Sequence, residues 1–113
     1  ATKNNTTLTV QLAINYGGWD EIARAINKAL SAGITSFTPE TLLSFVDNPS
    51  VPLPDMIVRS AGEERLSGFM LLQSNYSEFG FYDDLWPDWN EAMVDRIVSD
   101  YQSRTRKYGG LVK

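Results

Sequence analysis

The first periodic stretch of the chain alternates apolar and polar residues with a period of two. Its apolar members are Leu8, Val10, Leu12 and Ile14. Such alternation places one set of side chains on one face of an extended chain, so it predicts a strand over residues 8–14. The stretch ends at residues 15–18 (NYGG), where two glycines permit a tight turn.

The period then changes to that of an α-helix. From Trp19 onwards the apolar side chains recur on one helical face, which we expect to contain Ile22 and Ala29 but not Glu21, and Gly33 provides a stop. A second, shorter helix should open at residues 38–40 (TPE), because threonine caps helices and proline suits a first turn.

The clearest helical pattern follows residue 88. Asp88 and Glu91 have the spacing of a capping box. The expected buried face consists of Met93, Val94, Ile97, Val98 and Tyr101. Basic residues between 104 and 107 fall in the expected last turns, where cations suit the helix dipole, and glycines 109 and 110 end the helix.

Two further strands are predicted between these helices. Residues 56–58 (MIV) form a short apolar run, and the alternation from Phe79 to Leu85 indicates a final strand. Between them, residues 69–76 have the composition of a short buried helix. Strands alternating with helices predict an α/β fold with a mainly parallel sheet, in one unit over residues 1–113. Three strands with so few helices leave one sheet face partly uncovered, so we expect part of a sheet to be missing.

Composition narrows the chemistry. The 113 residues include no Cys and no His, which excludes a disulfide, a Cys/His zinc site, a thiol nucleophile and a Ser-His-Asp triad within the chain. The net charge of −4 is a poor footprint for nucleic acid. No apolar run is long enough to cross a bilayer, and the absence of Cys fits a cytoplasmic location. The chain begins at Ala1 rather than Met, which we interpret as a cut through a longer protein.

The loop after the second predicted strand carries the main candidate site. Arg59 ends that strand, Arg65 and Ser67 follow, and Gly62 lets the loop fold back. Two guanidinium groups, a hydroxyl and backbone N–H groups around one loop could hold a phosphate or diphosphate. The residues alone leave an alternative open, in which both arginines pair with nearby carboxylates such as Glu63 on the surface.

Glu78 is the second candidate. It lies among aromatic residues, where a carboxylate is costly unless it is paired or bound to a metal ion. The alternative is an exposed glutamate on a half-buried turn.

Five segments, in order, resemble the signatures of the cis-prenyltransferases. They are residues 15–18 (NYGG), 59–69 (RSAGEERLSGF), 74–79 (SNYSEF), 85–89 (LWPDW) and 104–110 (RTRKYGG). The resemblance spans residues 8–110. Within the family, the five segments are most similar to those of undecaprenyl diphosphate synthases. It covers the carboxyl-terminal half of the family's fold, because the amino-terminal signature with its metal-linked aspartate is absent.

The resemblance implies a prenyl transfer reaction. The family condenses isopentenyl diphosphate with an allylic diphosphate, such as farnesyl diphosphate, to make polyprenyl diphosphate. By this resemblance Arg59, Arg65 and Ser67 bind the diphosphate of isopentenyl diphosphate, and Glu78 helps to hold Mg2+. Glu63, which the resemblance places near the reacting groups, is the catalytic candidate. The missing amino-terminal half would be needed for activity, so the chain alone is expected to be inactive.

The resemblance also implies partners. The complete enzyme is expected to be a homodimer whose closing segment, with Lys107 and Gly109, reaches the partner's site, and to contact the membrane peripherally when it releases its lipid product. Lys107 replaces the family's Arg, which keeps the charge but loses the planar fork. A non-catalytic partner subunit of a cis-prenyltransferase heteromer, or an inactive truncated product, are the alternatives.

Overall fold

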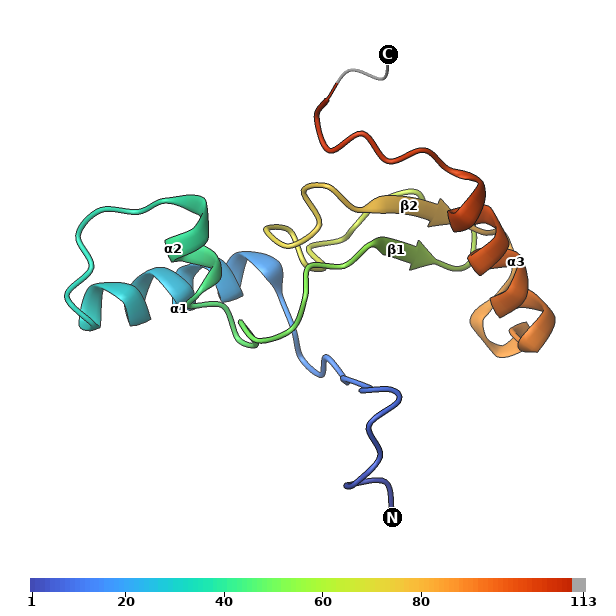
Figure 1. Cartoon of the computed structure of the whole chain (residues 1–113), viewed down its shortest axis with the longest axis horizontal. Helices are drawn as coiled ribbons and strands as arrows, with labels where there is room; N and C mark the ends of the chain where they lie inside the picture. Colours follow the sequence, from blue (N-terminus) through green and yellow to red (C-terminus); the bar gives the residue numbers. More distant parts are fainter. Residues whose placement is uncertain (111–113) are drawn as a thin grey trace.

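The computed structural model describes residues 1–110. Its elements are α1 (Gly18–Ser31), α2 (Pro39–Leu43), β1 (Met56–Arg59), β2 (Glu78–Phe81), the 3-10 helix η1 (Trp86–Asp88) and α3 (Glu91–Ser103). Figure 1 shows the two strands side by side between α1 and α2 at one end and α3 at the other. The last three residues of the unit expected over 1–113 lie outside the described part. The predicted α/β class with a parallel sheet flanked by helices is confirmed.

The strand pair is parallel, and residues 60–77 form the connection that a parallel pair requires. In its register Met56 is opposite Glu78 and Arg59 is opposite Phe81. Because successive side chains of a strand point to opposite faces, Met56 and Glu78 share one face while Arg59 and Phe81 share the other.

The predicted helices near the start are confirmed. Thr38 caps α2 through its hydroxyl, which accepts the Thr41 N–H at 3.1 Å. Gly33 follows α1 with a φ of 85°, a left-handed conformation that glycine adopts readily. The buried face of α1 differs from the prediction, because its buried side chains include Glu21, Ala25 and Ala29, which recur every fourth residue.

The predicted strand over residues 8–14 is wrong. The described backbone there is irregular, and Leu8, Val10, Leu12 and Ile14 are 73–83% exposed. A strand is defined by hydrogen bonds to a neighbour, and no partner strand is present for this segment among residues 1–110. Figure 1 shows it extending away from β1 and β2. The alternating pattern is therefore present in the sequence, but the described residues provide no strand with which it pairs.

Residues 69–76 form turns rather than the expected helix. Met70 has a φ of 47° and the preceding Gly68 one of 81°, and these left-handed conformations interrupt a right-handed helix. The strand expected to run from Phe79 to Leu85 is shorter and ends at Phe81.

The last helix begins and ends differently from the prediction. Asn90 is its N-cap, with Oδ1 accepting the Met93 N–H at 3.2 Å, and Asp88 belongs to η1 instead. Met93 is buried, whereas Val94 and Val98 are about half exposed, so the expected apolar face is only partly covered. The helix ends at Ser103, so the basic residues and glycines that follow lie beyond it.

None of the helices in the described part combines the length and the apolar character that a membrane crossing needs.

Candidate functional site

The loop after β1 folds back because its first residues are tied to the segment after β2. The N–H groups of Ala61 and Gly62 donate to the carbonyls of Asp84 and Tyr82 at 3.0 and 2.9 Å. Both residues have a φ of 65°, so the backbone turns sharply here. The turn directs the remainder of the loop back toward the end of β1.

Arg59 closes this loop from the strand end. Its Nη1 donates to Ser67 Oγ at 2.9 Å and to the carbonyl oxygen of Arg65. A cavity of about 320 Å³ lies against the loop, and Arg59, Arg65, Ser67 and Tyr16 are among its lining residues. All three predicted anion-binding residues therefore lie around one hollow.

The alternative interpretation, in which both arginines pair with nearby carboxylates, holds for Arg65 but not for Arg59. Arg65 forms an ion pair with Glu63, in which the Arg65 side chain is exposed and the Glu63 side chain is partly exposed. For Arg59, the described residues provide no carboxylate partner, and its contacts are the loop carbonyl and hydroxyl. Glu63 thus lies beside the hollow through its pairing with Arg65.

The backbone at the far end of the loop is held by a close approach. The Gly18 N–H donates to the Gly68 carbonyl at 2.8 Å, which joins the start of α1 to the end of the loop. A Cβ at Gly18 would overlap that carbonyl and lie 2.8 Å from Leu71 Cγ. Neither Gly17 nor Gly18 has a left-handed φ, so backbone conformation does not require glycine at either position. Glycine is required at position 18 by the close packing against Gly68 and Leu71.

Glu78 lies apart from the loop. It occupies the first position of β2 on the face opposite to Arg59, three register positions away, which is about 10 Å along the strands. Its Oε2 accepts a hydrogen bond from Arg104 at 3.2 Å, so the carboxylate is paired rather than isolated among aromatic side chains.

Mg2+ was expected at Glu78 from the resemblance alone. Within residues 1–110 no group of three or more acidic, Cys or His side chains could hold a metal ion. Mg2+ in proteins is commonly held by one or two carboxylates together with phosphate oxygens and water, and in this arrangement the Glu78 carboxylate is instead paired with a guanidinium group. We therefore assign no step of a reaction to a metal ion on the residues described.

The closing segment is extended rather than helical. Arg104, the C-cap of α3, has φ −86° and ψ 147°. Side chains then alternate, with Arg104 and Arg106 half-buried and Thr105 and Lys107 exposed. Gly109 has a φ of 78° and lies against the ring of Tyr76. The predicted tail residues Lys107 and Gly109 are thus both exposed.

One buried carboxylate was missed by the sequence analysis. Glu21, only 3% exposed, accepts hydrogen bonds from the Tyr16 hydroxyl, from Gln73 Nε2 at 3.0 Å and from the Asp47 N–H at 3.1 Å. It therefore joins the NYGG turn, the segment after α2 and the 69–76 turns. Its four-residue spacing from Ala25 was the available signal, because both lie on one face of α1.

Burial and the hydrogen bond to Glu21 raise the pKa of the Tyr16 hydroxyl to about 12. The same Tyr16 ring packs edge-on against Phe69, with ring centroids 5.6 Å apart, and lines the hollow beside the loop. The network around Glu21 thus holds one wall of the candidate site.

Known proteins are similar to this chain in sequence and in fold. The prenyltransferase family model described as "Putative undecaprenyl diphosphate synthase" matches residues 1–109. An isoprenyl transferase of Neisseria gonorrhoeae is 41% identical over 108 residues, which cover 96% of this chain and 44% of that protein. The ditrans,polycis-undecaprenyl-diphosphate synthase of Micrococcus luteus, named as specific for (2E,6E)-farnesyl diphosphate, is 39% identical and covers 97% of this chain and 47% of its own length.

Two solved structures share the fold. A probable undecaprenyl diphosphate synthase from Campylobacter jejuni superposes with a TM-score of 0.75 at 32% identity, over 85% of this chain and 45% of that one. Lavandulyl diphosphate synthase from Lavandula x intermedia, in complex with dimethylallyl diphosphate, gives a TM-score of 0.78 at 32% identity, over 85% and 44%. The chain spans about half the length of the relatives it matches. With a family model that matches almost its whole length, the chain belongs to the undecaprenyl diphosphate synthase family of cis-prenyltransferases.

Proposed function

We propose that this chain supplies the diphosphate-binding part of the isopentenyl diphosphate site in a cis-prenyltransferase. The observation that carries the proposal is the convergence of Arg59, Arg65 and Ser67 on one hollow at the carboxyl end of β1. Ligands of open parallel sheets bind beyond the carboxyl ends of the strands, so the hollow lies where a substrate is expected.

The arrangement of Arg59 supports anion binding. Its two hydrogen bonds to the loop both use Nη1, which leaves the Nη2 edge of the guanidinium group available for diphosphate oxygens. A guanidinium group that is already oriented loses less conformational entropy when it binds an anion. Arg59 is therefore the anchor that we expect to contribute most to affinity.

Arg65 and Glu63 respond to a ligand together. Their ion pair is exposed, and such pairs contribute about 0–1 kcal/mol to stability, so a diphosphate with several negative charges can take Arg65 from Glu63. Glu63 would then be left beside the bound substrate, in agreement with the position that the resemblance implies for it.

The complete reaction needs more than this chain. We propose that the amino-terminal half of the fold supplies the allylic diphosphate site and the aspartate that the family links to Mg2+, and that the complete enzyme is a homodimer. A cytoplasmic location with peripheral membrane contact also remains a proposal. In this view the residues described here bind and orient isopentenyl diphosphate, which converts a bimolecular encounter into a positioned one.

Calorimetric titration of the chain with inorganic diphosphate tests the binding proposal. We expect Arg59→Ala and Arg65→Ala each to weaken binding about tenfold or more, since each removes a charge-assisted contact. Arg96→Ala is the matched control, because Arg96 lies on α3, pairs with Asp84 and does not line the hollow. Equal affinity of all three variants and the wild-type chain would refute the proposal.

Incorporation of radiolabelled isopentenyl diphosphate tests the activity. We expect no turnover by the chain alone, and turnover when an amino-terminal half carrying the aspartate motif is added. In the assembled enzyme Arg59→Ala should abolish turnover. If Arg59→Ala left assembled activity unchanged, the chain would instead be a non-catalytic partner subunit.

A further inference from the structure

The segment after α3 returns along β2 and is held there by two arginines. Figure 1 shows this segment passing over β2 toward the start of the strand. Arg104 contacts the carbonyl of Phe79, and Arg106 contacts the carbonyl of Tyr76, so the segment and β2 run in opposite directions. We call the two arginines and their partners the tail clamp.

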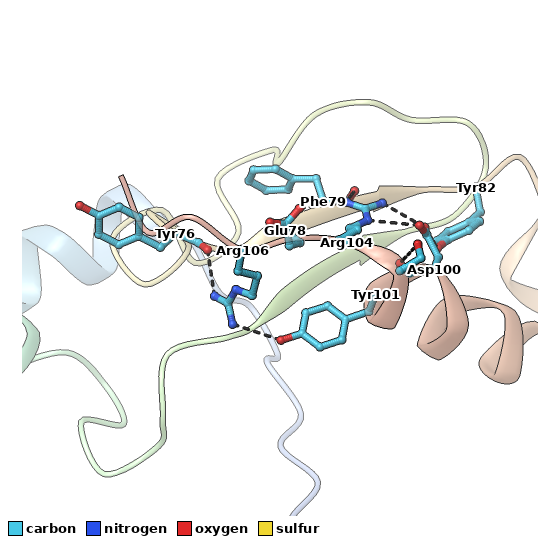
Figure 2. A network of polar contacts seen from close by, with 9 residues as sticks. Tyr76, Glu78, Phe79, Tyr82, Asp100, Tyr101, Arg104 and Arg106 are labelled. Atoms are coloured by element: carbon cyan, nitrogen blue, oxygen red, sulfur yellow. Dashed lines mark hydrogen bonds and ion pairs between the residues drawn. The ribbon is translucent and has the colours of Figure 1, made fainter. Parts of the chain in front are cut away.

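The first point of the tail clamp joins α3 to β2 through Arg104. Its Nε and Nη2 donate to the two carboxylate oxygens of Asp100 at 3.2 and 3.0 Å, a bidentate arrangement. Its Nη1 donates to the Phe79 carbonyl at 2.7 Å and to Glu78 Oε2 at 3.2 Å. Figure 2 shows the guanidinium group of Arg104 between Glu78 and Asp100.

Asp100 is itself held from the other side. The Tyr82 hydroxyl donates to Asp100 Oδ2 at 2.6 Å, and the hydrogen bonds from Arg104 and Tyr82 lower the pKa of the Asp100 carboxyl. The carboxylate therefore stays ionised and available to Arg104. Of the two acidic partners of Arg104, only Glu78 belongs to the strand pair.

The second point of the tail clamp is Arg106, whose side chain is only 15% exposed. It donates to the Tyr76 carbonyl at 3.0 Å and the Tyr101 hydroxyl at 3.1 Å, and it pairs with Asp55 before β1. Its guanidinium carbon lies 4.3 Å from the centre of the Tyr108 ring, a cation–π distance.

The contacts of Arg104 and Arg106 fix two positions of the extended segment and so determine the direction of the residues between and after them. Because side chains alternate in an extended segment, fixing Arg104 and Arg106 inward turns Thr105 and Lys107 outward. Among residues 1–110 the Lys107 ammonium group has no hydrogen bond or ion pair. The tail clamp thus leaves this cation exposed to solvent.

We propose that Glu78 is a positioning residue that anchors the carboxyl-terminal segment through Arg104, rather than a metal ligand of this chain. Its carboxylate is engaged by a guanidinium group and lies on the face opposite to Arg59. The anchoring role of Glu78 does not depend on the proposed function. Only a contact between the exposed Lys107 and a diphosphate rests on it.

Trypsin provides a direct test, because the segment contains cleavage sites at Arg104, Arg106 and Lys107. Cleavage of a folded chain follows the population of locally open states. In the wild-type chain we expect mass spectrometry to show faster cleavage after Lys107 than after Arg104. Glu78→Ala should raise the rate after Arg104 about fivefold or more, and Asp100→Ala should do the same from the other side of the guanidinium group.

Glu64→Ala is the matched control, since Glu64 is exposed and has no ion pair in the described part. Cleavage at Arg24 within α1 reports whether the rest of the fold is intact, and it should be equal in all variants. An unchanged rate after Arg104 in Glu78→Ala would overturn the proposal.

Addition of millimolar Mg2+ to the wild-type chain separates the anchor from a metal ligand. We expect the cleavage rate after Arg104 not to rise. A rise that matches Glu78→Ala would show that the ion takes the carboxylate from Arg104, and would overturn the proposal. Diphosphate affinity of Glu78→Ala, measured by calorimetry, should equal that of the wild-type chain. The cleavage rate tests the proposal for Glu78, and the diphosphate affinity tests the proposed function, so one proposal can be refuted without the other.

Discussion

The guanidinium group of Arg59 donates a hydrogen bond to the Ser67 hydroxyl at 2.9 Å, and this contact closes the loop that follows β1. It joins a residue held by strand pairing to one with a left-handed φ of 49° at the far end of the loop. The hollow between them is therefore held in shape by contacts within the chain itself. Pre-organisation of this kind lowers the entropic cost of binding, because the loop is already ordered.

Ser67→Ala should weaken the binding of inorganic diphosphate about three- to tenfold, because it removes a hydroxyl contact and frees the Arg59 side chain. The unfolding temperature should change little, since the contact is exposed. Titration calorimetry and thermal melting measure the two effects. Ser99→Ala on the outer side of α3 is the control and should leave both unchanged. Equal diphosphate affinity of the two variants would contradict this role of Ser67.

Gly18→Ala should destabilise the chain by about 1–3 kcal/mol, the usual cost of overpacking. The added Cβ would overlap the Gly68 carbonyl and lie 2.8 Å from Leu71 Cγ, so either α1 or the end of the loop must move. Urea denaturation measures the loss, and diphosphate titration should show weaker binding because the loop end shifts.

The neighbouring glycine provides a matched control for this substitution. A Cβ at Gly17 would meet only Asp20 Cβ, at 3.8 Å, and its φ of −142° suits any residue. Gly17→Ala should therefore cost only about 0.5–1 kcal/mol, the difference between glycine and alanine at an N-cap. Similar losses in both variants would show that the close approach of Gly18 to Gly68 does not restrict this position.

Because of Tyr16, the free energy of unfolding should decrease as the pH rises through the alkaline range. Its folded-state pKa is raised from 10.0 to about 12 by burial and by the hydrogen bond to Glu21, so the folded chain keeps a proton that the unfolded chain has lost. This contribution is present in full below about pH 10 and is lost as the pH rises toward about 12. Chemical denaturation at pH 9 and pH 11.5 should show a smaller pH-dependent loss in Tyr16→Phe than in the wild-type chain. Tyr76→Phe, which changes a more exposed ring, should behave as the wild type does.

Local patterns predicted the elements that local interactions stabilise. The cap of Thr38, the helical period after Trp19 and the apolar run at residues 56–58 each correspond to an element of the structure. The predictions failed where a distant part of the chain decides the outcome. Residues 8–14 have a strand sequence without a partner strand in the described part, and residues 69–76 contain a left-handed Met70 that the sequence does not reveal.

The candidate site shows the same division. Sequence spacing was sufficient to bring Arg59, Arg65 and Ser67 together, because they lie on one short loop whose ends cannot separate far. It could not find the carboxylate of Glu21, whose three donors come from segments up to 52 residues away in the chain.

By itself the sequence determined the chemistry of this protein: a loop of arginines and a serine after a strand, without cysteine or histidine, in the order of a prenyltransferase family. Only the tertiary structure decided which groups meet. Parallel pairing in the register Met56–Glu78 turns Glu78 away from Arg59, and the return of the chain after α3 brings Arg104 to it. The physical reason is that side chains alternate between the two faces of a strand pair, so the register decides which residues share a site.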